Sequence, residues 1–222
     1  PGSPMAAFAV ESLVDEMCRE LKLDPIAVRL KNGAKNGSKS SYGPVYNVIG
    51  LAETLEAAKA HPNYAIPLGP NQGRGVASGF WFNHGGETSV TLAVGEDGTA
   101  TVMIGTPDIG GSRASIGLMV AETLGIPYEN VRVNVVETGA LGVNEPTHGS
   151  RATFASGKAA VEAARQAIAE MCRRAAADWG IDAEAVEWKD GAAHPAGPNA
   201  GKHPPMSIGE IGAKMGGSGG PI

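Results

Sequence analysis

Cysteine, aromatic residues and basic charge are all scarce in this chain of 222 residues. The two cysteines, Cys18 and Cys172, stand far apart, which argues against a disulfide framework or a structural metal site. Both are interpreted as small buried hydrophobes in a reducing, cytoplasmic setting. A net charge of −5 and an aromatic content of 5% leave no basic stripe with interleaved aromatics, so nucleic acid is excluded as a partner.

Long hydrophobic runs are missing as well. The sequence contains no stretch of about 18 apolar residues, so we predict no membrane span, and no signal peptide is visible. The chain starts at Pro1 and ends on the open sequence GGSGGPI. We therefore expect a fragment that is truncated at both ends.

Two common cofactor signatures are incomplete. Gly105 and Gly110 have the spacing of a Walker loop, but the required lysine is missing, which disfavours nucleotide hydrolysis. No G-x-G-x-x-G follows a predicted strand, so a Rossmann nicotinamide site is disfavoured too. No Ser/His/Asp set, reactive thiolate or metal-ligand cluster emerges. His84 and His148 border glycine-rich loops and are interpreted as hydrogen-bonded loop histidines.

The chain does contain two related glycine-rich segments, GTPDIGGSR at Gly105–Arg113 and GSRATFASG at Gly149–Gly157. Each combines glycine, serine and arginine between a strand-like run and a helical pattern. Free backbone N–H groups at a helix start favour an anion, and arginine adds a forked donor suited to phosphate. Each segment alone is also a normal strand–helix turn. The repetition points to one anionic cofactor held from two sides.

The first part of the chain is predicted to be helical. Ser3-Pro4 and Asp24-Pro25 each indicate an N-cap followed by proline at the first helical position, and Gly33 ends the second helix. A third helix is expected from about Ile49 to Ala60, followed by a proline-rich linker over His61–Pro70. The following residues of the first helix recur at helical spacing and predict one apolar face: Met5, Phe8, Ala9, Leu13, Met17 and Leu21.

From Gly73 onward the pattern changes to strands and helices in alternation. Helices are expected over Ala114–Leu124 and from the second glycine-rich segment to about Asp178, and Ser207–Lys214 forms one or two helical turns. A short hairpin starting at Val186–Trp188 turns at Asp190-Gly191. The main strands are expected at Val76–Phe82, Thr88–Val94, Thr99–Ile104 and Val131–Val136.

These patterns predict an α+β fold. An N-terminal helical segment, residues 1–66, precedes a domain of residues 67–222 in which helices pack on one face of a mixed β-sheet.

Five motifs then occur in a fixed order: PGSPMAAFAVESLVDEM, LDPIAVRLKN, GRGVASGFWFN, GTPDIGGSR and GSRATFASGKAAVEAA. Together they resemble the molybdenum-binding large subunit of the xanthine dehydrogenase, aldehyde oxidase and carbon monoxide dehydrogenase family. The resemblance covers roughly Pro1 to Ala164 and implies a molybdopterin-binding domain. It implies a complete enzyme that oxidises an aldehyde, a purine or an N-heterocycle with oxygen from water.

The resemblance also implies cofactors and partners. The cofactor is expected to be molybdopterin, in the cytosine dinucleotide form, carrying molybdenum held mainly by the pterin sulfurs. Electrons would pass to 2Fe-2S clusters and FAD on other subunits or domains of a cytoplasmic oligomeric complex. The resemblance further implies cofactor contacts at these positions: Gly2, Gly110, Gly111, Ser112, Arg113, Gly149, Ser150 and Arg151.

No catalytic residue is expected within this chain, so the isolated fragment is predicted to be inactive. The family's glutamate base lies nearer the end of the subunit, and Gly209-Glu210 resembles it only superficially, within a predicted short surface helix. Many members carry glutamine at the position of Gly111 and glycine at that of Ser112. This departure favours a non-catalytic scaffold domain, whereas the two retained loops disfavour one. A module for a small phosphorylated ligand is a further alternative.

Overall fold

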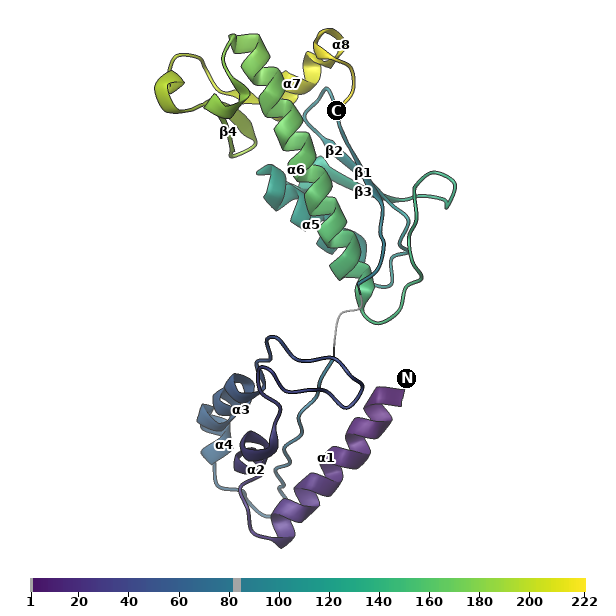
Figure 1. Cartoon of the computed structure of the whole chain (residues 1–222), viewed down its shortest axis with the longest axis vertical. Coiled ribbons are helices and arrows are strands. Elements are labelled where there is room, and N and C mark those ends of the chain that lie inside the picture. The colour runs from purple at the N-terminus through teal and green to yellow at the C-terminus, as the bar shows by residue number, and fades with distance from the viewer. Residues whose placement is uncertain (1, 82–84) are drawn as a thin grey trace. The chain divides into compact units, whose positions relative to one another are not determined.

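The computed structural model describes residues 2–81 and 85–222, which divide into two compact units, Pro1–Trp81 and Phe82–Ile222 (Figure 1). The domain boundary that we predict after residue 66 falls inside the first unit. The two units are described separately below.

The first unit is helical. As predicted, the Asp24 carboxylate caps the second helix by accepting the Ala27 N–H at 2.6 Å, and that helix stops before Gly33. The first helix begins at Gly2, so the predicted N-cap at Ser3 is wrong, and the predicted linker contains one short helix. The helices are α1 (Gly2–Glu20), α2 (Pro25–Asn32), α3 (Leu51–Ala60) and α4 (Pro62–Ala65).

Helix α1 has its polar face turned inward. Its Glu11 carboxylate accepts the Ser78 N–H at 2.7 Å and pairs with the buried Arg29 guanidinium at 2.8 Å. The Asp15 carboxylate accepts the Val76 N–H at 3.3 Å. The apolar face predicted for this helix is exposed; Phe8, for example, is 77% exposed. The usual rule of apolar side inward therefore fails for this helix.

The strand predicted at Val76–Phe82 does not form over its described residues, 76–81. The reason is visible in the same contacts, because side-chain carboxylates of α1 take the backbone N–H groups of Val76 and Ser78. Arg29 takes the Val76 carbonyl at 2.6 Å. The segment is thus held by side chains where a strand would be held by a neighbouring backbone.

The second unit is built on a three-stranded mixed sheet of β1 (Val90–Val94), β2 (Ala100–Ile104) and β3 (Val131–Val135). Strand β2 pairs antiparallel with β1 and parallel with β3. Helices α5 (Ser112–Leu124) and α6 (Arg151–Trp179) cover one face of it (Figure 1). Alternate residues of β2 are buried beneath these helices, namely Ala100, Val102 and Ile104.

A smaller antiparallel sheet continues this unit. The predicted hairpin is confirmed: β4 (Val186–Lys189) and β5 (Ala192–Pro195) turn at Asp190 and Gly191, which both have positive φ. The remaining elements are β6 (Met206–Ser207), α7 (Ile208–Ala213) and α8 (Met215–Ser218), with single 3-10 turns at Tyr128–Asn130, Ala183–Ala185 and Gly197–Asn199.

The hairpin of β4 and β5 contacts backbone atoms at the end of α5. The Trp188 indole N–H donates to the Leu124 carbonyl at 2.8 Å. A Cβ placed on Gly125 would lie 2.7 Å from the Gly191 nitrogen, so both positions require glycine. The predicted α+β class, with a helical N-terminal part and a mixed sheet covered on one face, is confirmed.

Candidate functional site: two glycine-rich loops at one sheet edge

Parallel pairing of β2 with β3 brings the two glycine-rich segments together. Loop 1 (Gly105–Arg113) follows β2, and loop 2 (residues 144–151) lies on the connection from β3 to α6. Because parallel strands end at the same sheet edge, both loops leave from that edge, which is where open α/β sheets bind ligands. A bond of 2.8 Å between the buried hydroxyls of Thr106 and Ser156 ties loop 1 to α6.

Loop 1 wraps around its own acidic residue. Asp108 Oδ1 accepts the N–H groups of Gly110 and Ser112, each at 3.0 Å, and the Ser112 hydroxyl at 3.1 Å. Arg113 Nε donates to Asp108 Oδ2, also at 3.0 Å. Gly110 and Gly111 have φ of 121° and 86°, a conformation that lets the chain turn back on the carboxylate.

These contacts define the charge of loop 1. The Arg113 guanidinium, followed by the Gly110 amide and Ser112, holds the pKa of Asp108 well below its usual range. The carboxylate thus neutralises the donors that we predict for a ligand. Asp108 is the residue that sequence reasoning missed. Its signal was available, because aspartate two residues before glycine is typical of a side chain that caps its own turn.

Loop 2 has the opposite electrostatics. Ser150 precedes α6 with φ of 61°, and its hydroxyl makes no capping bond to the helix. The first turn of α6 holds no acidic residue. Arg151 is completely buried, and within the described residues no carboxylate lies within ion-pair distance of it. The one acidic side chain of loop 2, Glu145, is directed to the Glu87 N–H at 3.4 Å and not to the start of α6, so the helix N-terminus keeps its positive potential.

The Arg151 guanidinium is directed into the protein. Its Nε donates to the Gly85 carbonyl at 2.7 Å, and Nη1 donates to the Glu145 carbonyl at 2.8 Å. Nη2 donates to the Glu87 carbonyl at 2.9 Å and to the Thr88 hydroxyl at 2.6 Å. Arg151 thereby fastens loop 2 to the segment that leads into β1.

Asn144 joins loop 2 to the start of loop 1. Its amide nitrogen would lie only 2.7 Å from a Cβ placed on Gly105, so these two segments touch. The Asn144 Oδ1 atom is buried and has no hydrogen-bond partner within the described residues. A buried acceptor without a donor calls for a partner. Loop 2 thus offers both positive potential and an unused acceptor.

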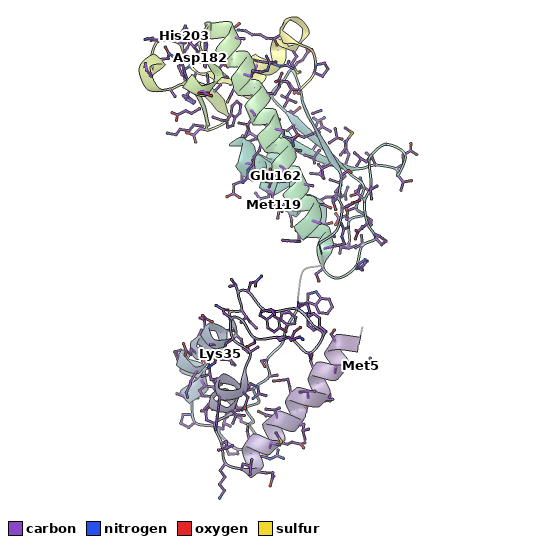
Figure 2. All side chains as sticks on the ribbon, viewed as in Figure 1. Met5, Lys35, Met119, Glu162, Asp182 and His203 are labelled. Atoms are coloured by element: carbon purple, nitrogen blue, oxygen red, sulfur yellow. The ribbon has the colours of Figure 1, made fainter. Side chains whose placement is uncertain are left out.

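Space for a ligand lies next to Ser150. A pocket of about 590 Å³ extends along α6 from this residue, with Met119 of α5 and Glu162 of α6 on its border (Figure 2). Phe154 gives it an apolar wall, and Lys158 is exposed there with no ion-pair partner in the described part of the chain. Apolar walls with a few polar groups are the usual make-up of a ligand site.

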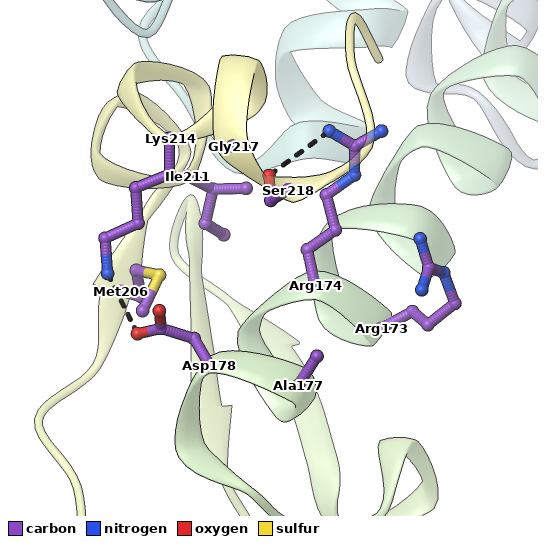
Figure 3. Close-up of a pocket in the computed structure, with 9 residues that line it drawn as sticks. All are labelled: Arg173, Arg174, Ala177, Asp178, Met206, Ile211, Lys214, Gly217 and Ser218. Carbon is purple, nitrogen blue, oxygen red and sulfur yellow. Dashed lines mark hydrogen bonds and ion pairs between the residues drawn. The ribbon is translucent and has the colours of Figure 1, made fainter.

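A second pocket, of about 240 Å³, lies at the far end of α6 (Figure 3). Its cations are already matched: Arg174 pairs with Glu170 and Lys214 with Asp178, at 2.7 and 2.8 Å. Bonds from Arg173 and then Arg174 lower the pKa of Glu170 to about 2. Because each of its three cations, Arg173 included, already has an ion-pair partner, this pocket is a weaker candidate for an anionic ligand than loop 2.

The remaining sequence candidates are Gly2, two histidines, Glu210 and the cysteines, and of these only His148 belongs to loop 2. Gly2 starts α1 in the first unit, His148 is exposed, and His84 lies outside the described residues. Glu210 accepts the backbone N–H of Ser207 at 2.8 Å in a capping box of α7, as expected for a short surface helix. Cys18 is buried as predicted, and Cys172 is half-buried.

Two whole-chain properties also bear on function. Across residues 2–81 and 85–222, no group of three histidine, cysteine, aspartate or glutamate side chains could hold a metal ion. In the same part of the chain, no helix combines the length and the apolar character that crossing a bilayer requires.

The fold and the paired loops define an α+β cofactor-binding domain. Residues 50–218 match the family described as molybdopterin cofactor-binding domain. The chain belongs to this family, and the resemblance expected from the sequence is confirmed at that level.

Known relatives agree. The chain is 31% identical over 147 residues to a xanthine dehydrogenase molybdenum-binding subunit of Escherichia coli O157:H7, covering 60% of this chain and 20% of that protein. It is 25% identical over 190 residues to an aldehyde oxidoreductase of Megalodesulfovibrio gigas, covering 78% and 20%. It spans about a fifth of the length of these relatives.

A solved structure confirms the fold. Quinoline 2-oxidoreductase from Pseudomonas putida 86 superposes with a TM-score of 0.70 at 19% identity, covering 94% of this chain and 29% of that one.

Proposed function

We propose that this chain is the cofactor-cradling part of a molybdenum hydroxylase large subunit. The observation that carries the proposal is the meeting of the two glycine-rich loops at the carboxyl ends of β2 and β3, where Gly105 touches Asn144 and Thr106 ties loop 1 to Ser156 of α6. A ligand held there is gripped from two sides, as the sequence motifs lead us to expect.

The residues present fit a molybdopterin group. At Gly110 and Gly111, nothing lies within 4 Å of where a Cβ would be, so a flat ring can approach the backbone closely. The Gly149 and Ser150 donors at the start of α6 suit a phosphate or pyrophosphate of a dinucleotide form. Arg151 holds those donors in place from behind.

Ser112 and Arg113 complete the proposed contacts of the second unit, whereas the cofactor contact proposed for Gly2, in the first unit, rests on the sequence resemblance alone. The terminal nitrogens of Arg113 bond to none of the described residues, and its side chain is 54% exposed, so its outer edge remains accessible. When bound, the molybdenum–pterin group supplies two-electron redox chemistry, and residues outside this chain supply the base.

The complete protein is proposed to oxidise an aldehyde, a purine or an N-heterocycle with oxygen from water. Iron–sulfur and FAD subunits or domains would carry the electrons away in a cytoplasmic oligomeric complex. Without those parts and without the base, the 222 residues alone are proposed to be inactive.

A charge introduced at loop 2 tests the proposal. In the complete protein, Ser150→Asp places a carboxylate where we place the cofactor's phosphate, and electrostatic repulsion should lower cofactor content about tenfold or more. Molybdenum is measured by mass spectrometry, and pterin by fluorescence after release. The matched control is Ser207→Asp, which changes the N-cap serine of α7 far from the loops in sequence.

Full cofactor content in Ser150→Asp would refute the assignment of loop 2. Absence of both molybdenum and pterin from the unmodified protein would favour the scaffold alternative.

A further inference from the structure

The Asp108 carboxylate occupies the position that a bound anion would take at loop 1. Both of its oxygens are used: Oδ1 by the Gly110 amide and the Ser112 amide and hydroxyl, Oδ2 by Arg113. These are the donors that a glycine-rich loop at a helix start offers to a phosphate. All of these partners lie in the Gly110–Arg113 turn, so the carboxylate is held by the loop although Asp108 as a residue is exposed.

A carboxylate in this position opposes the entry of a second anion. Two negative charges this close together repel each other, and water and salt at the protein surface reduce this repulsion without removing it. The incoming anion would also find the two amides already bonded. Loop 2 has no such occupant, since the first turn of α6 is free of acidic residues and Ser150 makes no capping bond.

We infer that Asp108 is a resident anion that keeps phosphate groups out of loop 1 and leaves loop 2 as the end of the site that receives them. Loop 1 then faces the uncharged ring of the ligand. Asp108 is a positioning residue, because it shapes Gly110–Arg113 and orients Arg113. The assignment of ring and phosphate to the two loops rests on the proposed function, whereas the exclusion of anions from loop 1 does not.

The experiment uses the full chain labelled with ¹⁵N and inorganic phosphate as the probe. In the unmodified protein, the Gly110 and Ser112 amide signals should not shift saturably as phosphate is added. In Asp108→Ala these signals should shift saturably. The dissociation constant for phosphate should be lower, by about tenfold or more, than that of any residual binding to the unmodified chain. Replacing Arg113 as well, in Asp108→Ala/Arg113→Ala, should weaken the new binding.

Two further variants keep the test decisive. Asp108→Asn retains an oxygen acceptor without the charge and should show the same gain to a smaller degree, even if the alanine variant folds poorly. Asp97→Ala is the matched control, because Asp97 also caps its own turn through Thr99 but lies outside loop 1. It should leave the phosphate response of Gly110 and Ser112 unchanged.

Two results would overturn the inference. One is saturable phosphate binding at Gly110 and Ser112 in the unmodified chain, as tight as in the variants. The other is a lack of response in both folded Asp108 variants. Neither result depends on the cofactor content measured for Ser150→Asp, so the two proposals fail independently.

Discussion

Loop 1 and loop 2 both end in Gly-Ser-Arg, but the electrostatic environments of their donor groups are opposite. In loop 1 the arginine turns toward a carboxylate from its own turn, and the donors are neutralised. In loop 2 the arginine turns into the protein toward carbonyl oxygens, the carboxylate of Glu145 accepts the Glu87 N–H, and the first turn of α6 holds no acidic residue. The comparison teaches that glycine, serine and arginine alone do not make an anion site. The position of the nearest acidic residue decides it.

The largest effect is expected at the buried arginine of loop 2. Arg151→Met leaves the carbonyls of Gly85, Glu87 and Glu145 without their donor, which should lower the free energy of unfolding by about 3 kcal/mol. Urea denaturation measures it. The control Arg165→Met removes an exposed pair with Glu162 and should change stability by less than about 0.5 kcal/mol. Equal losses in the two variants would remove the distinction between a buried and a surface arginine.

An intermediate effect is expected where loop 1 meets α6. Thr106→Val or Ser156→Ala each leaves one buried hydroxyl unpaired and should cost about 1–2 kcal/mol. The double variant should cost less than the sum, because neither hydroxyl is then left alone. Urea denaturation of the unmodified chain, the two single variants and the double variant gives the coupling energy. Strict additivity would mean that this bond does not hold loop 1 to α6.

The smallest effect is expected at Asp108 and depends on pH. Because the folded state lowers the pKa of Asp108, its carboxylate stabilises the fold above the unfolded-state pKa of about 3.9, and this stabilisation is lost as the pH falls. Asp108→Asn should therefore melt below the unmodified chain near pH 7, and the difference should shrink below about pH 4. Thermal melts across this range measure it. A difference that stays constant with pH would show that the charge of Asp108 contributes nothing.

The sequence predicted most of the second unit. Alternation in Thr99–Ile104 and Val131–Val136 is strong because one face of this sheet is buried, and Gly125 ended α5 as expected. Prediction failed at Val76–Phe82, where the local pattern of a strand is present. There the partner groups are carboxylates from α1, and nothing in the short-range pattern indicates such a long-range contact.

The site was predicted less completely than the fold. Glycine and serine at Gly149-Ser150 are visible in the sequence, but the direction of an arginine side chain is not. Arg151 points inward because four acceptors surround it, and three of them come from distant residues of the segment that leads into β1. The face of α1 shows the same limit, since Met5 and Phe8 have helical spacing whether they point toward the protein or toward solvent.

The contact between Gly125 and Gly191 has a consequence for evolution. A Cβ on either residue would lie within 3 Å of backbone atoms of the other, so neither position can accept even alanine unless the hairpin and α5 move apart. In a survey of all single substitutions, both positions would therefore be as intolerant as a binding residue, although they only set the spacing between two structural layers. Intolerance to substitution is thus a poor guide to function in this domain.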